Sequence, residues 1–104
     1  PNNPTGKILP EKLQYEIIEV AKENNLYVLS DEIYSQYAKT NWKSILSYNY
    51  EKSIVTQSFS KSHAMTGFRV GYAIASKPII DKMVKLEALC LTNVSGRFRK
   101  REFI

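Results

Sequence analysis

The chain has 104 residues, of which 43% are hydrophobic and 24% charged, and these are the proportions of an ordinary globular segment of one domain at most. No apolar run approaches the roughly 20 residues that a membrane span needs, so neither a membrane protein nor a secreted protein is expected. Cys90 is the only cysteine and His63 the only histidine, which excludes an intrachain disulfide and leaves no ligand pattern for zinc. We therefore expect a reducing, cytoplasmic setting and no metal site.

The net charge of +5 is concentrated at the C-terminal end of the sequence. Residues 96–104 contain four basic residues and one acidic residue, whereas the other 95 residues contain eleven basic and nine acidic ones. A cationic surface spread over a folded domain is not indicated, so no nucleic-acid partner is expected. We interpret residues 96–104 as a basic tail that is disordered or aberrant.

The N-terminal half predicts a helix followed closely by a strand. Pro10 suits a first helical position and Glu11 the positive end of the helix dipole, and the helix is expected to end near Asn24. Four apolar residues recur there at helical spacing: Leu13, Ile17, Val20 and Ala21. Residues 26–29 form a short apolar run that ends in Ser30 and Asp31, which favours a strand buried on both faces.

Further elements follow in an order typical of α/β folds. Residues 37–52 predict a loop with a short helix over 45–48. β-branched residues predict strands over 54–58 and 70–75. Apolar residues at helical spacing predict an amphipathic helix over 78–91.

Residues that can carry chemistry fall in a turn or directly after the expected strands. Asn3 lies in a turn defined by its Pro and Gly neighbours. Asp31 and Tyr34 follow the first strand, and Lys61 follows the second, with Arg69 eight residues later. Each has an ordinary explanation by itself, such as a solvated charge. Because ligands of open α/β sheets bind at the carboxyl ends of strands, these residues together can converge on one crevice.

The order and spacing of three motifs resemble a known family. PNNPTG (residues 1–6), SDEIY (30–34) and SFSKSHAMTGFRVGY (58–72) are similar to the large domain of class I/II aminotransferases, the aspartate aminotransferase-like enzymes of fold type I that use pyridoxal 5'-phosphate. The resemblance covers residues 1–95 and implies an incomplete α/β domain that binds this cofactor, with a mostly parallel sheet and flanking helices. Members of the family are several times longer, so we expect a fragment that does not fold stably or catalyse by itself.

The resemblance also assigns roles to individual residues. Lys61 matches the lysine that holds the cofactor as an internal aldimine and then moves protons during the reaction. Arg69 matches the arginine that binds the cofactor phosphate with paired hydrogen bonds, and Ser58 matches a hydroxyl donor to the same phosphate.

Three further residues match groups around the cofactor ring. Asp31 matches the carboxylate that keeps the pyridine nitrogen protonated. Tyr34 and Asn3 match the pair that hydrogen-bonds the 3-oxygen. Glu32 is expected to face the protein interior, and His63 is expected to be structural because the lysine already supplies a base.

The implied function is transfer of an amino group between an α-amino acid and a 2-oxo acid by a homodimer, with aspartate or aromatic amino acids as first candidates. Two alternatives stay open. A lyase or synthase of the same fold would use Lys61, Asp31 and Arg69 with a different fate for the carbanion. A transcription regulator would keep the domain as a ligand sensor and would need a DNA-binding segment.

Overall fold

The computed structural model describes residues 1–39 and 42–90. The predicted tail over residues 96–104 lies outside these ranges. The elements, in chain order, are α1 (Glu11–Glu23), β1 (Val28–Asp31), the 3-10 turns η1 (Ser35–Tyr37) and η2 (Ile45–Tyr48), β2 (Ser53–Ser58), α2 (Phe59–Ser62), the 3-10 turn η3 (Thr66–Phe68), β3 (Gly71–Ala75) and α3 (Lys77–Cys90). None of the described helices is both long enough and apolar enough to cross a membrane.

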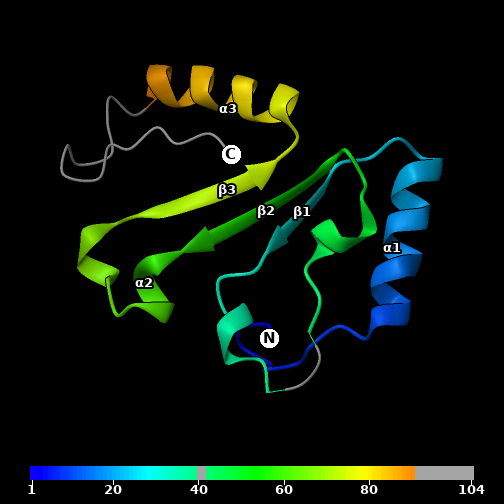
Figure 1. The fold of residues 1–104 in the computed structure, drawn as a ribbon, viewed down its shortest axis with the longest axis horizontal. Helices are drawn as coiled ribbons and strands as arrows, with labels where there is room; N and C mark the ends of the chain where they lie inside the picture. The colour runs from blue at the N-terminus through cyan, green and yellow to red at the C-terminus, as the bar shows by residue number, and fades with distance from the viewer. Residues whose placement is uncertain (40–41, 91–104) are drawn as a thin grey trace.

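The three described strands form one mixed sheet in the order β1-β2-β3. β1 runs parallel to β2, with Asp31 opposite Thr56, and β3 runs antiparallel to β2, with Gly71 opposite Ser58. In Figure 1 the arrowheads of β1 and β2 point toward α2 and the N-terminus, while β3 points toward α3. The predicted α/β class is confirmed as a partial fold, although only one of the two described strand pairs is parallel.

Helix α1 closely matches the predicted helix at residues 10–24. Pro10 has the extended angles φ −57° and ψ 145°, so it precedes the helix instead of occupying the predicted first helical position. The helix ends at Asn24, whose backbone and side-chain amides donate to the carbonyl of Val20 at 3.1 and 2.9 Å. These bonds satisfy a carbonyl that the last turn would otherwise leave unpaired.

The core is small and lies between α1, η2 and β2. Ile18 of α1, Ile45 of η2 and Val55 of β2 are buried against one another. Four partly buried residues pack around them: Val28, Leu46, Tyr48 and Tyr50. The short helix predicted over residues 45–48 is confirmed as η2, and its Ile45 supplies one of the core side chains.

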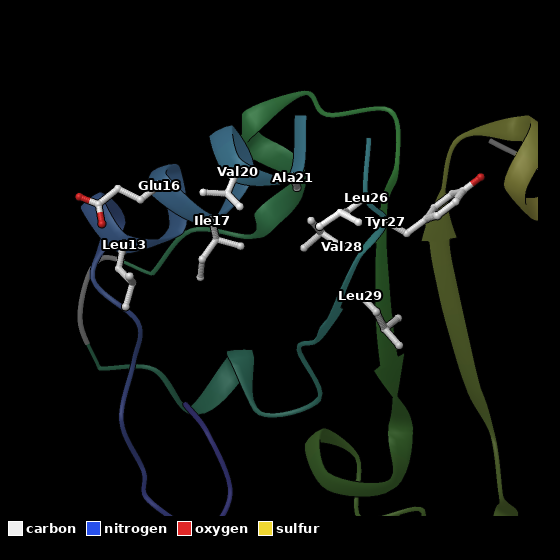
Figure 2. A pocket seen from close by; sticks show the side chains of 9 residues that line it. All are labelled: Leu13, Glu16, Ile17, Val20, Ala21, Leu26, Tyr27, Val28 and Leu29. Carbon is white, nitrogen blue, oxygen red and sulfur yellow. The ribbon is translucent and has the colours of Figure 1, made fainter. Parts of the chain in front are cut away.

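An apolar groove of about 500 Å³ separates α1 from β1. Figure 2 shows Leu13 and Ile17 of α1 on one side of this groove and Leu26 and Val28 on the other. Leu29 is 68% exposed, so the prediction that this strand is buried on both faces is wrong for the described chain. An apolar strand face needs a second layer, and within the described ranges α1 covers it only in part.

Candidate functional site

Three loops meet at one edge of the sheet. Asp31 ends β1 and Ser58 ends β2, and because these strands are parallel their carboxyl ends lie at the same edge. Gly71 begins the antiparallel strand β3 opposite Ser58, so the preceding loop with Arg69 arrives at that edge as well. Lys61 lies in α2, which begins directly after β2. The sheet topology therefore brings the predicted residues of strands β1, β2 and β3 to one side of the molecule.

The N-terminal turn brings Asn3 to the same region. Backbone hydrogen bonds between Asn2 and Lys7 at 2.8 Å and between Gly6 and Asn2 at 2.7 Å close the turn, and Gly6 adopts φ +67°. This left-handed conformation costs glycine little because it has no Cβ. The side-chain amide of Asn3 donates to the hydroxyl of Tyr34 at 3.3 Å. Two residues predicted to act as a pair are thus hydrogen-bonded.

Helix α2 presents Lys61. The Ser58 hydroxyl accepts a hydrogen bond from the amide of Ser60 at 3.0 Å, which caps the start of this helix. The same hydroxyl donates to the carbonyl of Val70 at 3.1 Å and so ties α2 to the loop before β3. The side chain of Lys61 is exposed, and its amine has no hydrogen bond or ion pair among the described residues.

The loop that carries Arg69 is fixed by its backbone. Arg69 directly follows η3 and lies in the left-handed region, with φ 54° and ψ 44°, and its Nη1 donates to the carbonyl of Thr66 at 3.3 Å. Two residues later, a Cβ added to Gly71 would lie 2.7 Å from the carbonyl oxygen of Gln57. Only glycine permits this close approach of β3 to β2, so the glycine of the motif sets where the loop that carries Arg69 ends and β3 begins.

Asp31 lines a cavity of about 450 Å³ that extends to the N-terminal segment. One carboxylate oxygen, Oδ1, accepts a hydrogen bond from the amide of Ile33 at 3.2 Å. Trp42 and Lys43 line the same cavity. A hydrogen bond from Lys43 to Glu11 raises the pKa of the Lys43 amine above its ordinary value, and the same bond joins this part of the cavity lining to α1.

Glu32 faces the interior, as predicted, and positions the loop around Asp31. It is 7% exposed, and its Oε1 accepts hydrogen bonds from the amide of Ile45 and the hydroxyl of Ser44, both at 3.0 Å. The hydroxyl of Ser30 donates to the same oxygen at 3.2 Å. The carboxylate therefore joins the end of β1 to the start of η2.

His63 has structural contacts. Its ring lies 5.3 Å from that of Phe59 in an edge-to-face arrangement, and its Nδ1 is 2.7 Å from the hydroxyl of Ser62. Phe59 in turn packs against Tyr72 of β3 at 5.5 Å. These contacts support the prediction that His63 is structural, because the ring lies in an aromatic cluster that joins α2 to β3.

One residue near the site was missed by the motif analysis. The hydroxyl of Tyr37 donates to the backbone carbonyl of Lys61 at 2.7 Å. A signal was available in the sequence, because Tyr37 follows Tyr34 by three residues and a 3-10 turn places such residues on one side. Their ring centroids are 6.3 Å apart.

The site thus combines an amine, a carboxylate and a guanidinium that are not paired with one another. No hydrogen bond or ion pair joins Lys61, Asp31 and Arg69 within residues 1–39 and 42–90, and the ion pairs there involve other residues. The described chain also holds no cluster of three His, Cys, Asp or Glu side chains that suits a metal ion. Such open groups at the carboxyl edge of an α/β sheet can bind an anionic small molecule and react with a carbonyl carbon.

The chain belongs to the family described as aminotransferase class I and II, whose sequence profile matches residues 1–96. This confirms the resemblance expected from the three motifs.

Individual relatives agree with this assignment. An aspartate aminotransferase of Pyrococcus horikoshii is 39% identical over 98 residues, which are 92% of this chain and 25% of that protein. An aromatic-amino-acid aminotransferase of Thermococcus litoralis is 41% identical over 91 residues, or 84% of this chain and 23% of that protein. The crystal structure of aspartate aminotransferase from Thermotoga maritima superposes with a TM-score of 0.82 and 35% identity, covering 86% of this chain and 25% of that one. The chain therefore spans about a quarter of the length of these relatives.

Proposed function

We propose that the whole protein containing this chain is a pyridoxal 5'-phosphate-dependent transaminase, which transfers an amino group between an α-amino acid and a 2-oxo acid. The observation that carries the proposal is a set of three groups at one sheet edge that are not paired with one another: the Lys61 amine, the Asp31 carboxylate and the Arg69 guanidinium. The three similar proteins named above are all aminotransferases, which favours amino-group transfer over a lyase reaction or a regulatory role.

The chemistry of these side chains fits the cofactor. When bound, pyridoxal phosphate supplies an aldehyde that an amine can join with loss of water, and a ring that accepts electrons from the substrate. Lys61 carries the amine for this covalent bond, and its nitrogen forms no hydrogen bond or ion pair with any described residue. The guanidinium of Arg69 can donate paired hydrogen bonds to a phosphate, because only its Nη1 is engaged, with Thr66.

Two further residues can form hydrogen bonds with the cofactor ring, one as acceptor and one as donor. Asp31 accepts the amide of Ile33 on one oxygen, so its second carboxylate oxygen could accept a hydrogen bond from a protonated ring nitrogen. The Tyr34 hydroxyl accepts from Asn3, so its own hydrogen is available to a neighbouring oxygen of the cofactor.

Ser58 has a conditional role in phosphate binding. Its hydroxyl hydrogen points to the carbonyl of Val70, so donation to a phosphate requires it to rotate away from this partner. The Lys61 amine, when it is not bonded to the cofactor, would be a base, and we infer that it would move the substrate proton.

The proposed transaminase function also suggests substrates, an assembly and a cellular location. We propose α-amino acids and 2-oxo acids as substrates, with aspartate and aromatic amino acids tested first, and a homodimer as the assembly. We also propose a cytoplasmic location, since Cys90 is the one cysteine of these 104 residues. Sedimentation of the whole protein checks the assembly.

The test uses the whole protein with pyridoxal phosphate, followed by borohydride reduction and peptide mass spectrometry. We expect a visible absorbance band and a reduced cofactor adduct on Lys61, both absent in Lys61→Ala. Lys85→Ala, which changes an exposed lysine on α3, is the matched control and should label like the unmodified protein. Adduct formation at undiminished yield in Lys61→Ala would refute the assignment.

A further inference from the structure

A single tyrosine hydroxyl fixes the backbone of the residue that carries the site amine. The hydroxyl of Tyr37 in η1 donates to the carbonyl of Lys61 in α2 at 2.7 Å, across 24 residues of sequence. Helix α2 has only four residues, so its carbonyls lack the partners that a longer helix would supply. The same Lys61 carbonyl also receives the backbone amides of Ala64, at 3.5 Å, and of His63, which closes the short helix. The bond from Tyr37 is shorter than the one from Ala64, and it comes from outside the helix.

The turn that carries Tyr37 is itself anchored. The side-chain amide of Gln57 in β2 donates to the hydroxyl of Ser35 at 3.0 Å, which attaches η1 to the central strand. Tyr34, which caps η1, packs against Tyr37 and accepts the hydrogen bond from Asn3. One 3-10 turn thus connects the Asn3–Tyr34 pair to the backbone of Lys61.

This connection is separate from the hydrophobic core. Tyr37 is 55% exposed in the described chain, and the core cluster consists of Ile18, Ile45 and Val55. Loss of the Tyr37 hydroxyl leaves those core contacts in place. Removal of this hydroxyl should therefore alter the position of Lys61 and leave the packing of the domain unchanged.

We propose that Tyr37 is a positioning residue for the covalent chemistry of Lys61, an inference that rests on the function proposed above. A lysine side chain is long and flexible, so the positions that its amine can reach depend on where the backbone of that lysine is held. The hydrogen bond from Tyr37 restricts the position of the Lys61 backbone, and so would limit the positions from which the amine could reach an aldehyde carbon. Reaction rates are steeply sensitive to such placement.

The experiment compares Tyr37→Phe with the unmodified whole protein and with a matched control, Tyr48→Phe. The control also removes a phenolic hydroxyl that donates to a backbone carbonyl, but this carbonyl is that of Glu11 at the start of α1, at 3.2 Å, and not one of α2. Two probes are used. Pyridoxal phosphate bonds covalently to Lys61, and the rate is followed by visible absorbance after rapid mixing. Pyridoxamine phosphate has no aldehyde and reports non-covalent affinity by calorimetry.

We expect Tyr37→Phe to slow covalent bond formation about fivefold, the effect of one neutral hydrogen bond, while its affinity for pyridoxamine phosphate stays within about twofold. Tyr48→Phe should change neither quantity. An unchanged covalent rate in Tyr37→Phe overturns the proposal, and so does an equal loss with both probes, because the hydroxyl would then only support the fold. If the unmodified protein forms no bond at Lys61, the proposed function itself has failed.

Discussion

Replacement of Glu32 by alanine tests how the buried carboxylate holds the loop that follows β1. In Glu32→Ala the amide of Ile45 loses an acceptor at 3.0 Å in a buried position. The hydroxyls of Ser44 and Ser30 lose acceptors at 3.0 and 3.2 Å, but these groups are only partly buried. The substitution therefore removes three hydrogen bonds from one oxygen and leaves one buried donor without a partner.

The magnitude follows from burial. A buried amide left unsatisfied costs about 1–3 kcal/mol, and each hydroxyl, which can turn toward water, adds about 0.5 kcal/mol. The sum is about 3 kcal/mol, which corresponds to a change of somewhat over 100-fold in the local opening equilibrium. In Glu32→Gln a side-chain oxygen remains to accept from Ile45, so about 1 kcal/mol is expected.

Hydrogen–deuterium exchange of the whole protein measures this effect locally, at the amides of residues 45–48. We expect their protection to fall about 100-fold in Glu32→Ala and about fivefold in Glu32→Gln. Glu51→Ala, at an exposed glutamate that has no hydrogen bond among the described residues, is the control and should stay within about 0.5 kcal/mol. Equal protection in Glu32→Ala and Glu51→Ala would show that the carboxylate does not hold η2.

Two further substitutions test the sheet. Ser53 is 2% exposed and its hydroxyl has no partner among the described residues, so Ser53→Ala should stabilise the domain by about 1 kcal/mol, measured as an upward shift in thermal unfolding; a lower unfolding temperature would contradict this reasoning. Gly71→Ala should destabilise it by about 2 kcal/mol, because the new Cβ would lie 2.7 Å from the Gln57 carbonyl. Gly67→Ala, where nothing lies within 4 Å, is the control, and equal unfolding temperatures for the two variants would rule out the clash.

The candidate site was predictable to the extent that its residues occur in motifs at strand ends. Asp31, Ser58 and Arg69 reach one edge because each lies at or next to the end of a strand, and strand ends can be read from short apolar runs. The contact between Asn3 and Tyr34 also agrees with the pairing that the family resemblance implied. The roles of these residues toward the cofactor stay predictions until the adduct and the variants are measured.

Other parts of the site depended on contacts between distant segments. The bond from Tyr37 to Lys61 spans 24 residues, and the spacing of Tyr37 from Tyr34 does not by itself indicate Lys61 as the partner. Sequence patterns indicated an inward-facing Glu32, but its three donors come from β1 and η2 and become known only when these segments pack together.

The sequence alone determined the local elements, because helical and strand periodicity and turn residues act over a few neighbouring positions. It fixed α1, η2, α3 and the three strands to within a few residues. The tertiary structure decided the antiparallel direction of β3, the exposed face at Leu29 and the tyrosine contact to Lys61. These features depend on which segments pack together, and packing between residues far apart in the chain leaves no repeating pattern in the sequence.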